Sequence, residues 1–281
     1  MTALWQQRPV GIVGLGLIGG SLGLDLLARG AEVRALVHRQ ATAERALERG
    51  LVSAVSTDPG LLGDCGLVLL ALPLDRLLAP DPALLAALPP EAVITDVGSV
   101  KGPVLEVWEA LLGPGGCSRF VGSHPMAGTA RSGVEAGELD LFRGRPWVVT
   151  PTARTDPQAT AAVLALAEDL GAIALRCTAS DHDRAVALIS HLPVLVSAAL
   201  LQAADQGAAA DDLGALVRAL ASSGFADTSR VGGGNPELGT WMARWNREAL
   251  LAALAHYRQA LSGLEEAVHQ QDWAALQHTL S

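Results

Sequence analysis

The sequence is poor in aromatic residues and in positive charge, and the shortage of positive charge excludes a class of partner. Only 4% of its 281 residues are aromatic, and 20 Lys and Arg stand against 29 Asp and Glu, for a formal net charge of −9. Because binding to nucleic acid or to an anionic membrane needs a basic face, we expect neither partner. Charged residues make up 17% of the chain, below the usual fraction of about 25%. We therefore expect part of its apolar surface to be buried against a second copy.

Cysteine is also scarce. Cys65, Cys117 and Cys177 are odd in number and far apart, which is typical neither of a disulfide framework nor of a metal site. Residues 1–9 lack the basic cluster and apolar stretch of a signal peptide. We expect a cytoplasmic protein without a bound metal. The charge-free run over residues 185–204 is long enough to cross a bilayer, but its polar residues and central proline favour a buried helix.

Short apolar runs alternate with helical stretches over the first 175 or so residues, which predicts a doubly wound α/β fold. The expected strands are residues 10–13, 33–37, 67–71, 93–97, 120–123, 147–150 and 173–175. These runs are continuous rather than alternating, so the sheet should be largely parallel and covered on both faces. From residue 181 the chain is rich in Ala and Leu at helical spacing. We predict an α/β domain over residues 1–176 and an all-helical dimerisation domain over residues 177–281.

The first expected strand leads into GLGLIGGSL at residues 14–22. Its GxGxxG pattern lies between a strand and a helix, the context of a Rossmann dinucleotide site. The first glycine permits a tight turn, the second lets the backbone approach a pyrophosphate, and the third lets the helix pack on the strand. The predicted cofactor contacts here are Gly14, Leu15, Gly16, Leu17, Ile18 and Gly19. A glycine turn with a purely structural role is the alternative.

The second expected strand ends without the carboxylate that would hold the ribose hydroxyls of NAD. The chain reads His38, Arg39 and Gln40 at this point. A guanidinium offers a fork of donors for a 2′-phosphate, which favours NADP with His38 and Arg39 at its adenosine end. The alternative for Arg39 is a solvated side chain near the next helix.

Two further clusters follow later strands, TDVGSVK at residues 95–101 and GSHPMAGT at residues 122–129. Ligands of open parallel sheets bind beyond the carboxyl ends of the strands. A neutral imidazole there can accept a proton from a hydroxyl as hydride leaves the same carbon, and a nearby hydroxyl can fix its tautomer. From the residues alone, His124 is either a catalytic base or a structural cap.

Together with two downstream stretches, these clusters resemble the arogenate/prephenate dehydrogenase family of tyrosine biosynthesis, and most closely its cyanobacterial-type arogenate dehydrogenases. The downstream stretches are DHDRAVALISHLPV at residues 181–194 and SSGFADTSRVGGGNPELGT at residues 222–240. The resemblance spans nearly the whole chain in the expected order. The stretches most specific to this family are HPMAGT, SHLP and DTSRVGGGNPELGT.

The resemblance implies oxidative decarboxylation of a cyclohexadienol, with hydride transfer to a nicotinamide. Together with the preference for NADP inferred from Arg39, it predicts the conversion of L-arogenate to L-tyrosine with NADP. It implies that His124 accepts the proton of the ring hydroxyl and that Ser99 orients this histidine beside substrate and cofactor. Arg230 would bind a substrate carboxylate. His191 either lines the site or is a buried core histidine. Val194 stands where prephenate-preferring relatives often carry histidine, which favours arogenate.

Three alternatives remain open. The nearest is the same chemistry on prephenate, which yields 4-hydroxyphenylpyruvate. A β-hydroxyacid dehydrogenase would have a similar domain layout but needs a catalytic lysine in its helical half, and residues 177–281 contain no lysine. A catalytically silent dinucleotide-binding dimer would keep its glycines while losing the second cluster, whereas this chain retains Ser99, His124, His191 and Arg230.

Overall fold

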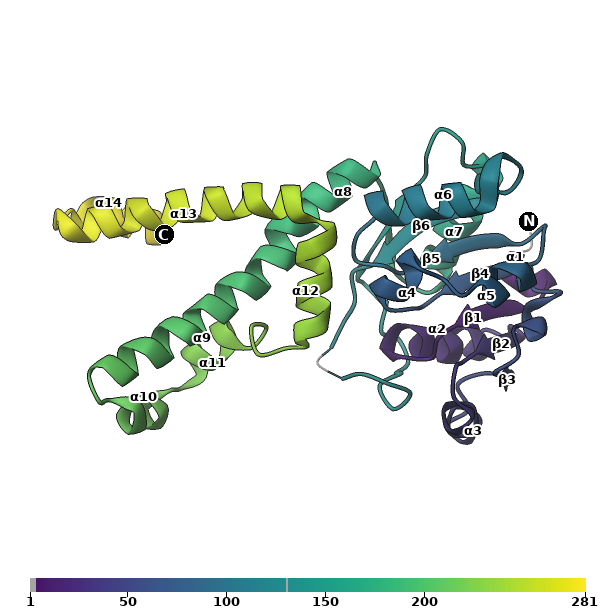
Figure 1. The fold of residues 1–281 in the computed structure, drawn as a ribbon, viewed down its shortest axis with the longest axis horizontal. Coiled ribbons are helices and arrows are strands. Elements are labelled where there is room, and N and C mark those ends of the chain that lie inside the picture. Colours follow the sequence, from purple (N-terminus) through teal and green to yellow (C-terminus); the bar gives the residue numbers. More distant parts are fainter. Residues whose placement is uncertain (1–3, 130) are drawn as a thin grey trace. The chain divides into compact units, whose positions relative to one another are not determined.

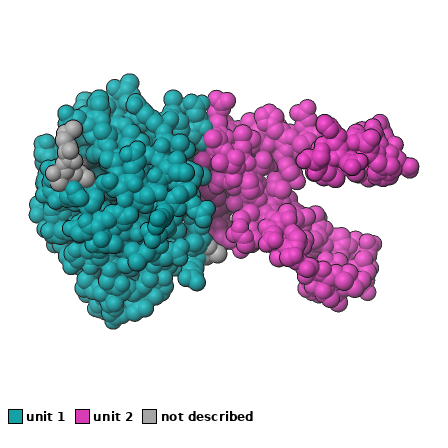
Figure 2. Space-filling model, turned by 180° about the vertical axis from the view of Figure 1, so that it is seen from behind, with its two compact units in different colours: residues 1–182 teal, residues 183–281 magenta. Residues whose placement is uncertain are grey.

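The computed structural model describes residues 4–129 and 131–281. The chain divides into two compact units, Met1–His182 and Asp183–Ser281, which Figure 2 shows in different colours. The first unit is built on a β-sheet, and the second consists of helices (Figure 1). The domain boundary after residue 176 stays a prediction, and residues 1–3 of the predicted first domain lie outside the described part.

The first unit contains an eight-stranded sheet in the order β3-β2-β1-β4-β5-β6-β7-β8. The strands are β1 (Val10–Val13), β2 (Val33–Leu36), β3 (Ala54–Ser56), β4 (Leu67–Leu70), β5 (Val93–Asp96), β6 (Phe120–Pro125), β7 (Pro146–Thr150) and β8 (Ile173–Arg176). All neighbouring strands pair in parallel except β6 and β7, which are antiparallel. The predicted α/β fold with a largely parallel sheet is confirmed.

The sheet is covered on both faces. Successive side chains of a strand point to opposite faces, and all four residues of β4 are buried, from Leu67 to Leu70. The helices of this unit are α1 (Leu4–Gln7), α2 (Leu17–Ala28), α3 (Gln40–Glu48), η1 (Pro59–Leu62), α4 (Leu74–Leu78), α5 (Pro82–Ala87), α6 (Gly102–Gly116), η2 (Cys117–Arg119) and α7 (Pro157–Asp169). Leu22 of α2 and Val163 of α7 belong to the same buried cluster as Ile12 of β1. This two-sided burial explains the continuous apolar runs in the sequence.

In the part of the chain that the structure describes, the regular elements of the second unit are all helices. They are α8 (Ala179–Val186), which begins in the first unit, a π-helical turn η3 (Ala187–His191), α9 (Leu192–Ala210), α10 (Gly214–Leu220), α11 (Ser223–Ser229), α12 (Pro236–Trp245), α13 (Arg247–His269) and α14 (Trp273–Leu280). The π turn ends at His191, two residues before Pro193, whose ring lacks an N–H and clashes with the preceding helical turn. The helical second half that the sequence predicts is confirmed.

One helix, Ala179–Ala210, is long and apolar enough to cross a membrane by length and composition, which is weak evidence for a span. Ser197 lies within it and is buried. Its Oγ donates to the carbonyl of Thr228 at 2.9 Å and accepts from the N–H of Gly232 at 2.8 Å. A Cβ on Gly232 would lie 2.3 Å from the nitrogen of Ala198, so only glycine permits this approach. The chain itself thus satisfies this polar group of α9.

The three cysteines are not paired with one another. Cys65 and Cys117 are buried, and Cys177 is partly exposed. Burial raises the pKa of the Cys65 thiol to about 11, so this thiol remains protonated and unreactive at neutral pH.

Candidate functional site

The glycine loop joins β1 to α2, and its glycines meet three separate requirements. Gly14 has a φ of +94°, and a Cβ there would lie 2.5 Å from the carbonyl oxygen of Ala71. A Cβ on Gly19 would lie 2.0 Å from the carbonyl oxygen of Gly14, so this residue lets α2 pack against the loop. A Cβ on Gly16 would meet nothing within 4 Å. The loop is therefore tightly packed at Gly14 and Gly19, whereas the space beside Gly16 is open.

The first turn of α2 has the features of an anion site. Gly16 is its N-cap residue, and no described side chain caps the helix there. The first N–H groups of a helix lack partners within the helix, and the positive end of its dipole favours a negative ligand. Residues 14–19 thus fit the pyrophosphate of a dinucleotide.

His38 and Arg39 follow β2, the strand beside β1, and leave the sheet at the same edge as the glycine loop. They connect β2, which ends at Leu36, to α3, which begins at Gln40. Because β2 pairs in parallel with β1, both connections leave the same edge of the sheet. Both side chains are exposed. The arginine is thus free to reach a ligand at this edge.

A buried network holds the chain just before His124. Lys101 and Asp96 have no exposed side-chain area and form an ion pair. Lys101 also donates from Nζ to the carbonyl of Ser123 at 2.6 Å. The other oxygen of Asp96, Oδ1, accepts from the N–H of Ser123 at 3.1 Å. These bonds connect the end of β5 and the start of α6 to β6.

The hydroxyl of Ser123 extends this network. It donates to the carbonyl of Asp96 at 2.8 Å and accepts from Thr95 at 3.0 Å and from the indole N–H of Trp147 at 3.1 Å. With its hydroxyl and both backbone groups bonded, Ser123 is fixed in the core. The next residue, His124, points to the other face of the strand and is partly buried.

The ring of His124 meets a second histidine. Its Nδ1 lies 2.9 Å from Nε2 of His182, and the two rings form an edge contact at 72° with centroids 5.1 Å apart. His182 lies on α8 with 2% of its surface exposed. From the sequence, His182 belongs to the DHD triplet at residues 181–183, which either caps a helix or takes part in catalysis. Its contact with His124 was not predicted, because the two histidines are 58 positions apart and no local pattern connects them. Ser99 is partly buried between β5 and α6, and its role stays a prediction.

The remaining predicted residues lie in the second unit. His191 ends the π turn with 1% of its surface exposed, and its Nδ1 lies 3.2 Å from the amide nitrogen of Asn246. An amide nitrogen only donates, so Nδ1 of His191 is the acceptor in this pair. Val194 lies in the first turn of α9 and is partly buried. Arg230 caps the C-terminal end of α11 and is exposed.

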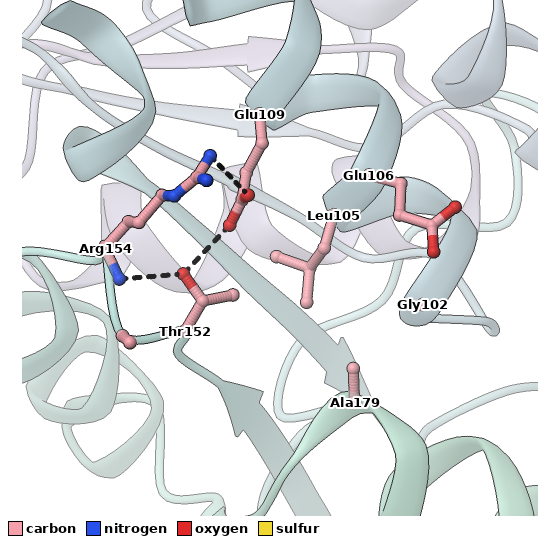
Figure 3. Close-up of a pocket in the computed structure, with 8 residues that line it drawn as sticks. Gly102, Leu105, Glu106, Glu109, Thr152, Arg154 and Ala179 are labelled. Atoms are coloured by element: carbon pink, nitrogen blue, oxygen red, sulfur yellow. Dashed lines mark hydrogen bonds and ion pairs between the residues drawn. The ribbon is translucent and has the colours of Figure 1, made fainter. Parts of the chain in front are cut away.

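A cavity of about 380 Å³ lies elsewhere on the first unit. Figure 3 shows its lining from α6, from the residues after β7 and from Ala179. Glu109 accepts from Thr152 at 2.9 Å and pairs with Arg154 at 3.4 Å. Thr152 and Arg154 follow β7. Because β7 runs antiparallel to β6, they lie at the sheet edge opposite to the one where His124 lies. None of the residues predicted for the site lines this cavity.

The strand order 3-2-1-4-5 with a glycine loop after β1 defines a nucleotide-binding protein of the Rossmann class. Residues 22–175 match the family described as "Prephenate dehydrogenase, nucleotide-binding domain", and residues 178–281 match "Prephenate dehydrogenase, dimerization domain". The chain belongs to the prephenate dehydrogenase family, the oxidoreductases of tyrosine biosynthesis that also include arogenate dehydrogenases. The resemblance inferred from the sequence is confirmed.

Similar proteins carry related names. Cyclohexadienyl dehydrogenase of Zymomonas mobilis is 32% identical over 268 residues, which cover 94% of this chain and 90% of that protein. Synechocystis arogenate dehydrogenase is 45% identical, with a TM-score of 0.80 over 97% of this chain and 96% of that chain. Prephenate dehydrogenase of Aquifex aeolicus, crystallised with hydroxyphenyl propionate and NAD+, is 26% identical, with a TM-score of 0.85 over 98% and 95% of the two chains.

Proposed function

We propose that this protein converts L-arogenate to L-tyrosine by oxidative decarboxylation with NADP. The observation that carries the proposal is the place of His124, at the sheet edge from which the glycine loop also leaves. The 45% identity to an arogenate dehydrogenase supports the choice of substrate.

The reaction transfers a hydride from the carbinol carbon and releases carbon dioxide from the ring. The hydroxyl proton leaves as the hydride departs and returns to the same oxygen when the electrons of the broken C–C bond aromatise the ring, which leaves a phenol. NADP, when bound, supplies the acceptor for the hydride. His124 accepts the hydroxyl proton at Nε2, the ring nitrogen that does not face His182. Ser99, in the loop after β5, approaches the substrate beside this histidine. Aromatisation of the ring makes the reaction effectively irreversible.

Substrate recognition is assigned to the second unit. The exposed guanidinium of Arg230 binds a substrate carboxylate, which suits its bidentate geometry. His191 lines the substrate site. Val194 disfavours prephenate, because valine cannot form a hydrogen bond with a keto acid side chain. The apolar side chain of Val194 lies near Gly239 on α12.

Cofactor choice is assigned to the segment after β2. NAD-binding proteins hold the ribose hydroxyls with a carboxylate at this point, and here the residues are His38 and Arg39. Arg39 would hold the 2′-phosphate of NADP through two parallel hydrogen bonds. NAD is the alternative cofactor, since the Aquifex aeolicus relative is in complex with NAD+.

Prephenate is the second candidate substrate. Curated relatives named prephenate dehydrogenase include that of Bacillus subtilis, which is 29% identical over 93% of this chain and 70% of the relative. The same dehydrogenation and decarboxylation would then yield 4-hydroxyphenylpyruvate, with the same role for His124.

The proposed assembly is a homodimer formed through the helical unit, in the cytoplasm. The matching family domain is described as a dimerization domain. Large apolar side chains of this unit are exposed in one chain: Leu213, Leu216, Leu220, Leu238, Leu251, Leu261, Val268, Trp273 and Leu280. Burial of such a surface stabilises a dimer.

Two variants test the assigned chemistry. His124→Asn removes the proton acceptor, so kcat should fall by about 100-fold or more with little change in KM. Arg230→Ala removes a substrate contact and should mainly raise the KM for the cyclohexadienol. Steady-state kinetics with arogenate and NADP measure both. The opposite pattern, a KM effect at His124 and a kcat effect at Arg230, would contradict the assignment.

A further inference from the structure

The contact between His124 and His182 joins the proposed base to a residue whose link to it no sequence pattern indicates. His124 lies in β6, and His182 lies on α8 with 2% of its surface exposed. Their ring nitrogens, Nδ1 of His124 and Nε2 of His182, are 2.9 Å apart. A pair of nitrogens at this distance shares one proton, with one ring donating and the other accepting.

We propose that His182 is a positioning residue that holds His124 in the tautomer with its proton on Nδ1. This inference rests on the proposed role of His124 as the base. In this tautomer Nε2 of His124 carries a lone pair and can accept the proton of a substrate hydroxyl. The other tautomer would carry its proton on Nε2 and could not act as a base.

The arrangement keeps its proton balance during the reaction. The O–H bond of the substrate breaks as the bond between Nε2 of His124 and the proton forms, and the proton returns to this oxygen when decarboxylation aromatises the ring. The proton on Nδ1 stays between the two rings, and the imidazolium donates it to the neutral ring of His182. His182 therefore stabilises the charged product form of His124 without touching the substrate.

The local structure fixes His182 in turn. Thr178 precedes α8, and its hydroxyl accepts from the N–H of Asp181 at 3.1 Å and donates to the carboxylate of Asp181 at 2.8 Å. The N–H of His182 donates to the carbonyl of Thr178 at 3.0 Å. This capped first turn, together with burial, leaves the imidazole of His182 little freedom. A rigid partner can impose one orientation on the ring of His124.

Tautomer state is the direct test, and it needs no substrate. Protein labelled with 15N-histidine at neutral pH gives ring nitrogen chemical shifts that separate protonated from unprotonated nitrogens. We expect Nε2 of His124 to be unprotonated in the wild type, with the signals assigned by their loss in His124→Asn. In His182→Phe, which keeps an aromatic ring but has no acceptor, this preference should be lost. Nε2 protonated in the neutral wild-type ring, or an unchanged tautomer in His182→Phe, would overturn the proposal.

Kinetics add a test with matched variants. His182→Phe should lower kcat by about 10- to 100-fold, part of what a positioned base contributes, with KM changed less than about twofold. His182→Gln places an amide oxygen near the lost Nε2 and should recover much of this loss. His278→Phe, an exposed histidine on α14, is the control and should leave kcat unchanged.

A double-mutant cycle separates positioning from a general structural effect. In a His124→Asn background there is no imidazole at position 124 to accept the substrate proton. His182→Phe should therefore cause no further loss of kcat in that background. An equal loss in both backgrounds would show that His182 acts through folding and would overturn the proposal. Absence of turnover in the wild type would contradict the proposed function, while the tautomer measurement still judges the role of His182.

Discussion

Lys101 and Asp96 are buried charges that support the residue that precedes His124. Both side chains have no exposed area, and each bonds to Ser123. Removing one partner of a buried ion pair leaves an uncompensated charge, which costs far more than the pair itself contributes. By its sequence position alone, Lys101 either contacts the nicotinamide or a phosphate of the cofactor or lies in solvent, whereas the structure places it in the core.

Lys101→Met should lower the free energy of unfolding by about 3–5 kcal/mol, because the carboxylate of Asp96 stays buried without its cation. Denaturation by urea, followed by circular dichroism, measures this change. Adding Asp96→Asn to Lys101→Met removes the unpaired charge and should recover part of the loss. Unchanged stability in the single variant would show that the pair does not support the fold.

Asp25 on α2 carries a second buried carboxylate. Its Oδ1 accepts from the N–H of Asp140 at 2.9 Å, while its Oδ2 is buried without a hydrogen-bond partner among the described residues. Burial raises the pKa of Asp25 above its ordinary value of 3.8. A raised pKa means that the folded state binds the proton more tightly than the unfolded state does. The stabilisation from the neutral acid is therefore complete below pH 3.8 and is lost as pH rises through the folded pKa.

Asp25→Asn replaces this carboxyl with a side chain that stays neutral. The stability of the variant minus that of the wild type should therefore increase as pH rises from 4 to 7. Urea unfolding at several pH values measures the difference, and Asp212→Asn, at an exposed position, controls for the loss of one negative charge. A difference that does not change with pH would contradict the raised pKa.

Single residues could be predicted from the sequence where a local pattern defines their task. Gly14, Gly16 and Gly19 follow a strand and open a helix, and each has the backbone environment that the pattern requires. The contact of His182 with His124 could not be predicted, because the two residues are 58 positions apart and only the tertiary fold brings the rings together. The burial of Lys101 likewise depends on β6 packing beside β5.

At the scale of elements, the junction of β1 and α2 offers a matched pair of substitutions. Gly19→Ala places a Cβ 2.0 Å from the carbonyl of Gly14, whereas Gly16→Ala meets nothing within 4 Å. Gly19→Ala should therefore lower the free energy of unfolding by about 1–3 kcal/mol through overpacking. Gly16→Ala should leave stability unchanged but raise the KM for NADP by about tenfold, equivalent to about 1.4 kcal/mol.

Thermal unfolding and cofactor titrations of both variants separate these effects. A normal KM for NADP in Gly16→Ala would remove this glycine from the cofactor site. Equal stability of Gly19→Ala and the wild type would mean that α2 can move away from the loop without cost.

The strands were predictable where both faces are buried, because burial imposes a continuous apolar run, as in β4. The exception is β3, a three-residue strand at the sheet edge whose residues are all partly exposed, so it carries no such run. The π turn before Pro193 also escaped prediction. The sequence shows the proline, but the choice between a kink and a π turn depends on packing.

At the scale of the whole molecule, the helical unit leaves many large apolar side chains exposed in a single chain. In Figure 1, α9 and α13 diverge within this unit from the region of the π turn. Light scattering coupled to gel filtration should therefore give twice the 29.0 kDa of one chain. A mass of one chain at micromolar concentration would contradict the proposed homodimer.

The central claim is tested most directly by initial rates with four combinations of reactants, arogenate or prephenate with NADP or NAD. The absorbance of the reduced nicotinamide follows each reaction. The account predicts the highest kcat/KM for arogenate with NADP, and a loss of the preference for NADP in Arg39→Ala. A higher kcat/KM for prephenate would contradict the role of Val194, and a higher value for NAD would contradict that of Arg39. No turnover in all four reactions would contradict the proposed enzyme activity itself.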